Sequence, residues 1–192
     1  MTKGNADRGN RAGQAAPNAR VAALEALLAV ERDEAYSNLA LNAALRRARL
    51  SARDAALATE LVYGTLQRLN TLDGVLAAHL GRDLRKLQPW VRNLLRLGAY
   101  QLLYLDRIPP HAAVGEAVAA ARRRGNPGAA GLVNAVLRKI AALPGPPPAP
   151  SGASAAARIA WEASHPEWLV RMWIDAFGEE KAERIAHANN LP

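Results

Sequence analysis

The basic side chains that gather near predicted helix ends are the residues of this sequence best suited to bind a ligand. They are Arg20, Arg122, Arg123, Arg124, Arg138 and Lys139. A guanidinium group binds phosphate through two parallel N–H donors and stacks on unpaired bases, which suits RNA loops better than an ammonium group does. Several such ends in one chain predict contact with RNA. The alternative is that each is only a solvated helix end, where a cation suits the helix dipole.

The charge distribution agrees with a polyanionic ligand. Net charge is +8, and the segment 18–143 carries 18 Lys and Arg residues against 10 Asp and Glu residues, whereas 144–192 has a small acidic excess. A basic body attracts phosphate groups through a Coulomb interaction that weakens as salt is added. A GC-rich genome that places Arg at solvated positions would produce the same composition, so the charge alone does not decide.

The sequence shows no pattern typical of a catalytic or metal site. It has no cysteine, which excludes disulfides, thiolate metal ligands and cysteine nucleophiles, and its four histidines form no pair at helical spacing. Glu60 and Tyr63 lack a nucleophile or oxyanion hole beside them, and we interpret them, like Asn134 and Arg138, as structural anchors. We therefore predict no catalytic residue and no metal in this chain.

Nothing in the sequence indicates a cofactor loop or a membrane segment. The glycines at 125, 128 and 131 follow no strand, so we interpret them as a turn and expect no cofactor in this chain. The one uncharged stretch of eighteen residues, 140–157, is proline-rich and unlike a membrane helix, and the first residues have no apolar core of the signal-peptide kind. We expect a cytoplasmic protein that does not bind a membrane.

The elements that must position these residues are helices. Half of the residues are hydrophobic, mostly Ala and Leu, with few aromatic or β-branched residues, which predicts an all-α fold. Apolar residues recur at helical spacing, and signals for helix starts divide the chain. The signals are Ser37 as an N-cap, Ser51 with Asp54, Thr71 with Asp73, Pro89, and Pro110. Within the most apolar helix, Gly98 is expected to permit a close crossing with another helix.

We expect four parts. Residues 1–17 should be a flexible basic arm, 18–143 a helical domain, 144–156 a proline-rich linker and 157–192 a helical connector. The connector holds Trp161, Trp168 and Trp173, too many large apolar side chains for about forty residues to bury alone. They are expected to pack on the main body or on a part outside this chain, and we expect the chain to be a fragment.

Four runs of the sequence form a recognisable set of motifs: TELVYGTL at 59–66, LRLGAYQLL at 95–103, IPPHAAV at 108–114 and LVNAVLR at 132–138. They resemble the NusB-like domain, and more closely the N-terminal domain of the RsmB (Sun, Fmu) family of 16S rRNA cytosine-C5 methyltransferases. The later SHPxWL at 164–169 and ANNxP at 188–192 resemble the segment that joins that domain to the methyltransferase core. One departure is that only Arg20 matches the arginine-rich first helix through which NusB binds RNA.

The resemblance implies a NusB-like bundle of about seven helices in two subdomains, with a short helical C-terminal appendage. It also implies an RNA-binding accessory domain that grips 16S rRNA, whereas S-adenosylmethionine and the catalytic cysteines belong to a methyltransferase domain outside this chain. The alternative function is transcription antitermination, with a protein-interaction module that pairs with a ribosomal protein through the tryptophan-rich segment 161–173. Regulation of transcription would then replace rRNA processing as its role.

Overall fold

The computed structural model describes residues 18–124 and 126–191, and every regular element in these ranges is a helix. The all-α prediction is confirmed; the predicted arm, residues 1–17, lies outside the described residues. The helices are α1 (Ala19–Arg32), α2 (Ser37–Ala48), α3 (Ala52–Gln67), α4 (Leu69–Leu80), the 3₁₀ helix η1 (Leu84–Lys86), α5 (Pro89–Tyr104), α6 (Pro110–Arg123), α7 (Pro127–Ala141), α8 (Ala155–Ala163), α9 (Glu167–Phe177) and α10 (Glu179–Ala188).

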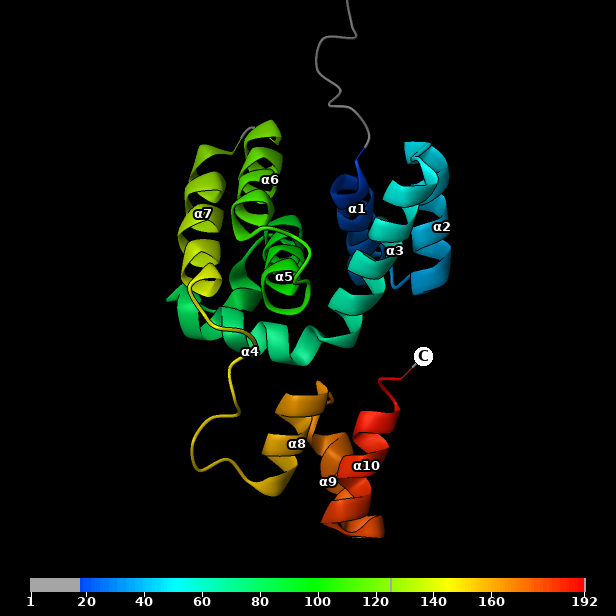
Figure 1. Cartoon of the computed structure of the whole chain (residues 1–192), viewed down its shortest axis with the longest axis vertical. Helices are drawn as coiled ribbons and strands as arrows, with labels where there is room; N and C mark the ends of the chain where they lie inside the picture. The colour runs from blue at the N-terminus through cyan, green and yellow to red at the C-terminus, as the bar shows by residue number, and fades with distance from the viewer. Residues whose placement is uncertain (1–17, 125, 192) are drawn as a thin grey trace, which may run out of the picture.

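The first seven α-helices form a bundle of two subdomains, as Figure 1 shows. Helices α1, α2 and α3 pack on one another, and α5, α6 and α7 form the second group, with α4 crossing at one end of both. Helix α5 lies between the groups and contacts α1, α3, α4, α6 and α7. One apolar core runs through the bundle, with Leu61, Leu76, Leu95 and Leu137 fully buried. The predicted bundle of about seven helices is confirmed.

Local helix signals explain several of the observed ends. Ser51 accepts a hydrogen bond from the backbone N–H of Asp54 at 3.2 Å, and its hydroxyl donates to the Asp54 carboxylate at 2.9 Å. Pro89 and Pro110 are the first residues of α5 and α6, where a missing N–H removes no helical hydrogen bond. These three predictions are confirmed.

Two predicted helix starts are wrong. Helix α2 begins at Ser37 with Tyr36 as its N-cap, so Ser37 makes no capping hydrogen bond. Helix α4 begins at Leu69, and Thr71 lies buried within it. The Thr71 hydroxyl instead donates to the carbonyl of Trp161, 90 residues away, at 2.5 Å. Thr71 therefore resembles a helix cap in the sequence, but its hydroxyl makes a tertiary contact with the appendage.

Two glycines let neighbouring helices approach α5 closely. A Cβ added to Gly98 of α5 would lie 2.5 Å from Leu137 Cδ1 on α7, and Leu137 is fully buried. A Cβ on Gly64 of α3 would lie 2.0 Å from the ring of Tyr100 on α5. The predicted close crossing at Gly98 is confirmed, and the glycines fix the distance of α5 from helices on both sides.

A partly buried ion-pair network joins α1, α4 and α5. The Glu31 carboxylate of α1 accepts hydrogen bonds from Arg92, from Asn93 at 2.6 Å and from Arg96 at 3.0 Å. Arg96 also donates two hydrogen bonds of 2.7 Å to Asp73 of α4. Burial raises the pKa of the Glu31 carboxyl, but the hydrogen bonds from Arg92 and Asn93 and the nearby arginine charges outweigh it, so that its pKa lies below the ordinary value.

The last three helices form an appendage with a small core of its own, centred on Ile159 and Val170. Helix α8 begins at Ala155, after a helix-free segment, and packs on α4. Trp161 lies over Gly74 of α4, where a Cβ would be 2.4 Å from its ring, and its indole N–H donates to the Pro147 carbonyl at 2.8 Å. No helix within 18–124 or 126–191 is both long and apolar enough to cross a membrane.

Replacing Gly98 should destabilise the bundle. Gly98→Ala forces its methyl group against the buried Leu137 side chain, and we expect a loss of about 1–3 kcal/mol in unfolding free energy. Gly115→Ala is the matched control, because a Cβ there meets no atom within 4 Å, and it should stabilise α6 by roughly 0.5–1 kcal/mol. Urea unfolding followed by circular dichroism measures both, and equal stabilities would contradict the close-packing argument.

Replacing Glu31 should weaken the fold and change its acid sensitivity. Glu31→Gln leaves two guanidinium groups without their shared carboxylate, and we expect a loss of about 2 kcal/mol at neutral pH, less than for a fully buried pair. Because the native pKa of Glu31 is lowered, its contribution is full above the unfolded pKa of about 4.3 and is lost as pH falls through the native pKa.

Wild type should therefore lose stability more steeply than Glu31→Gln as the pH is lowered from about 5. Urea unfolding at a series of pH values tests this. Glu180→Gln, at an exposed position of α10, is the control and should follow wild type. Parallel curves for wild type and Glu31→Gln would show that the network does not carry this acid sensitivity.

Candidate functional site

A groove lies on the surface between α6 and α7. Its volume is about 710 Å³, and Arg122, Arg123 and His111 of α6 line it together with Asn134 and Arg138 of α7. A second hollow of about 640 Å³ lies toward the start of α7 and shares Arg122, Asn134 and Arg138 with the first. The two hollows therefore form one continuous groove, which we call the α6–α7 groove. Figure 1 shows the two helices that form it lying side by side.

The α6–α7 groove is positive. None of the described residues that line its two hollows is Asp or Glu. Arg122, Arg123 and Arg138 are exposed and form no ion pair within 18–124 and 126–191. Arg138 Nε donates to Asn134 Oδ1 at 3.0 Å, which orients this side chain and leaves its terminal nitrogens for a ligand. The groove therefore offers several guanidinium donors to an anion.

The structure brings together only some of the predicted RNA-contacting residues. Arg122, Arg123 and Arg138 share the α6–α7 groove. Arg20 donates to Gln101 Oε1 at 2.7 Å, and it lines a narrow cleft with Arg123 between α1, α5 and α6. Lys139 is exposed but does not line the groove. Contact of these residues with RNA stays a prediction.

Arg124 differs from the two arginines before it. Its guanidinium forms an ion pair with Glu25 of α1 and lies 5.5 Å from the centre of the Trp90 ring of α5. Successive residues of a helix end point in different directions, so adjacent arginines of the same type have different neighbours. Arg124 therefore joins α6 to α1 and α5.

Several groove residues were not recognised from the sequence. His111, Gly115 and Val118 line it with Arg122, and the spacing of Gly115, Val118 and Arg122 places them on one face of α6. This spacing is the sequence signal from which the groove-lining face of α6 could be predicted. The Asn134–Arg138 pair was interpreted as an anchor, and its hydrogen bond exists, but the pair also borders the groove.

The structure supports one of the two residues of the other proposed anchor, Glu60 and Tyr63. Glu60 forms an ion pair with Arg107, in the turn between α5 and α6. Tyr63 is 43% exposed, so the structure does not support its interpretation as a structural anchor. Glu60 therefore links α3 to the second subdomain.

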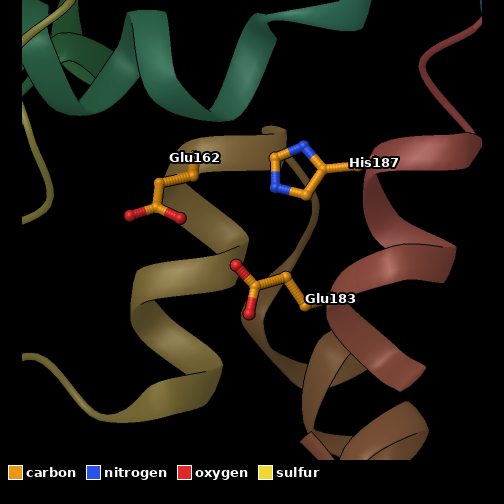
Figure 2. A group of neighbouring side chains, drawn as sticks. All are labelled: Glu162, Glu183 and His187. Carbon is orange, nitrogen blue, oxygen red and sulfur yellow. The ribbon is translucent and has the colours of Figure 1, made fainter. Parts of the chain in front are cut away.

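A cluster of possible metal ligands lies in the appendage. Ligand atoms of Glu162, Glu183 and His187 all lie within 4.8 Å of one another. Figure 2 shows these three side chains close together between α8 and α10. Arg158 already pairs with Glu162 and with both oxygens of Glu183, each at 3.0 Å. Hydrogen bonds from Arg158 lower the pKa of Glu183. A cation would have to displace this guanidinium, so we assign the cluster to holding α8 against α10.

The tryptophan-rich segment is divided between core and surface. Trp161 packs on the bundle core and Trp173 on the core of the appendage. Trp168 is 68% exposed and Met172 is 52% exposed, both on α9. Only part of the segment predicted to bind a protein is therefore free to do so within the described chain.

Comparisons with known proteins agree with the fold. The NusB family model matches residues 17–142. The probable ribosomal RNA small subunit methyltransferase B of Bacillus subtilis is 46% identical over 170 residues, which cover 88% of this chain and 38% of that protein. The chain thus spans well under half the length of this relative.

Solved structures give the same result. NusB of T. maritima is 26% identical with a TM-score of 0.62, over 70% of this chain and 94% of that one. A crystal structure of antitermination factors NusB and NusE in complex with dsRNA also matches. Its matching chain is 21% identical with a TM-score of 0.60, over 64% of this chain and 92% of that one.

Arg122 and Arg124 should differ in their effect on stability. Arg124→Ala removes the ion pair with Glu25 and the contact with Trp90, and we expect a loss of about 0.5–1 kcal/mol, limited by solvent screening. Arg122→Ala should change the unfolding free energy by no more than about 0.5 kcal/mol. Urea unfolding of both variants, with Glu25→Ala in a double-mutant cycle, measures the difference. A coupling near zero between Arg124 and Glu25 would count against the structural role.

Proposed function

The chain belongs to the NusB family, and on this premise we propose that it is an RNA-binding domain that helps a 16S rRNA (cytosine-C5) methyltransferase hold its substrate. The domain positions rRNA and carries no catalytic residue of its own. The substrate proposal is supported by the relative named as a probable ribosomal RNA small subunit methyltransferase, of which this chain matches 38%.

The observation that carries the proposal is the α6–α7 groove. Three exposed arginines converge on it without carboxylate neighbours in its lining. Neutralising phosphates with such groups releases counterions, which supplies affinity without base recognition. Arg20, close to Arg123, extends the positive surface toward α1. The NusB–NusE–dsRNA complex adds that RNA is compatible with this fold.

S-adenosylmethionine is not placed in this chain. In Rossmann-type folds a nucleotide cofactor lies at the carboxyl ends of parallel strands, beside a glycine-rich turn into a helix. Residues 18–124 and 126–191 offer only helices, so they do not fit such a site. In this proposal the cofactor and the methyl transfer belong to a domain outside this sequence.

A second candidate function is protein binding. The exposed Trp168 and Met172, one turn apart on α9, favour it, because a patch of neighbouring exposed apolar side chains is typical of an interaction surface. This candidate predicts a stoichiometric protein partner, such as a ribosomal protein, and only weak RNA binding. The RNA titration described next distinguishes the two candidate functions.

A salt series tests RNA binding. A labelled 16S rRNA hairpin is titrated with wild type and with a variant in which Arg122, Arg123 and Arg138 are all replaced by Ala. Removing three phosphate contacts should make the log–log salt slope shallower by about 2, with roughly tenfold weaker binding at low salt.

The control removes the same charge elsewhere. Arg32, Arg82 and Arg184 are exposed and lie outside the α6–α7 groove, and their triple Ala variant should bind nearly as wild type does. An equal loss of RNA affinity in both triple variants would indicate that RNA binds through the net charge of the protein and not at a localised site. No binding by wild type at low salt would refute the RNA function and leave the protein-binding candidate.

A further inference from the structure

We propose that the α6–α7 groove holds an unpaired nucleotide, with its base on the apolar wall of α6 and its phosphate against the arginines. The inference rests on the proposed function and adds the kind of RNA that the domain selects, which is a loop or other single-stranded segment in preference to a duplex.

Two helix glycines keep the groove open. Gly115 of α6 lines its first hollow and Gly131 of α7 its second, and a Cβ on either would meet nothing within 4 Å. A glycine inside a helix costs about 1 kcal/mol relative to alanine. Gly64 and Gly98 have close neighbours that account for them, whereas packing gives no reason for Gly115 or Gly131. Space for a ligand is a reason that fits both.

The walls of the groove suit a base better than a phosphate alone. Val114, Val118 and Ala119 give α6 an apolar surface along the groove. A nucleobase has a flat apolar face and polar edges, and unpaired bases in RNA are bound by burying that face while donors and acceptors read the edge. The volume of about 710 Å³ lies in the range typical of small-ligand pockets.

Polar groups stand where such a nucleotide needs them. Asn134 Oδ1 is occupied by Arg138 Nε, and no described residue accepts from the Asn134 amide nitrogen, so its N–H groups are available to a base carbonyl. Arg122 and Arg138 border both hollows, which places guanidinium donors beside the middle of the groove. The bases of a duplex are stacked and paired, and only their edges are exposed, so a duplex cannot place a base face on the apolar wall.

A series of variants at Gly115 separates the base contact from the phosphate contact. The methyl group of Gly115→Ala takes a small part of the space and the ring of Gly115→Phe fills the groove, and neither Cβ has an atom to displace. The probes are an RNA hairpin with an unpaired loop and a fully paired duplex of equal phosphate count. Burying the apolar face of one base against the aliphatic wall of α6 is expected to contribute roughly tenfold in affinity.

Wild type should prefer the hairpin, Gly115→Ala should bind the hairpin slightly more weakly, and Gly115→Phe should lose at least about tenfold of hairpin affinity. Binding of the duplex and its salt slope should stay unchanged in both variants. Unchanged circular dichroism and thermal unfolding show that each variant is folded.

The possible results distinguish the two proposals. If Gly115→Phe keeps the hairpin preference, or if wild type has none, the nucleotide site is refuted and the RNA function stands. If wild type binds neither RNA, the proposed function itself fails. If a poly-glutamate peptide displaces the hairpin and Gly115→Phe weakens the peptide equally, the groove recognises acidic chains in general and the nucleotide proposal is overturned.

Discussion

The close approach of helices to α5 is the constraint on which the remaining structure depends. Helix α5 touches five of the other six bundle helices, and at Gly98 it leaves room for only a hydrogen atom beside the buried Leu137. Since Leu137 belongs to α7, this contact fixes how closely α7 lies to α5. Helix α7 carries Asn134 and Arg138 of the α6–α7 groove, so the position of one wall of the groove depends on a core contact with α5.

The charged residues have two separate roles that composition does not distinguish. Arg92 and Arg96 face inward to Glu31 and Asp73 and hold α1, α4 and α5 together. Arg122 and Arg138 face solvent around a groove whose described lining has no carboxylate. The net charge of +8 therefore includes arginines that stabilise the fold, and only the remaining ones are available to bind a ligand.

How much the sequence could predict follows from the range of each interaction. Caps and first-turn prolines such as Ser51 and Pro89 act over three or four residues, so local pattern was sufficient for them. The prediction that Thr71 begins a helix is wrong, because the partner of its hydroxyl is the Trp161 carbonyl, 90 residues away. The groove forms where two helices pack side by side, and no local sequence pattern predicts which helices do so. The sequence likewise does not distinguish Arg122 from Arg124, because their different directions at the end of α6 depend on the folded structure.

The joint between bundle and appendage has a consequence for sequence divergence. Thr71, Gln67 and Arg68 of the bundle donate to the main-chain carbonyls of Trp161, Asn190 and Glu162. A carbonyl is the same for every residue type, so these contacts constrain the donors on the bundle far more than the residues that accept. Two side chains of the appendage are exceptions: Trp161 needs the space above Gly74, and the Ser164 hydroxyl accepts from the Thr71 backbone N–H at 3.2 Å. The other side chains of the appendage can change over evolutionary time without loss of these contacts.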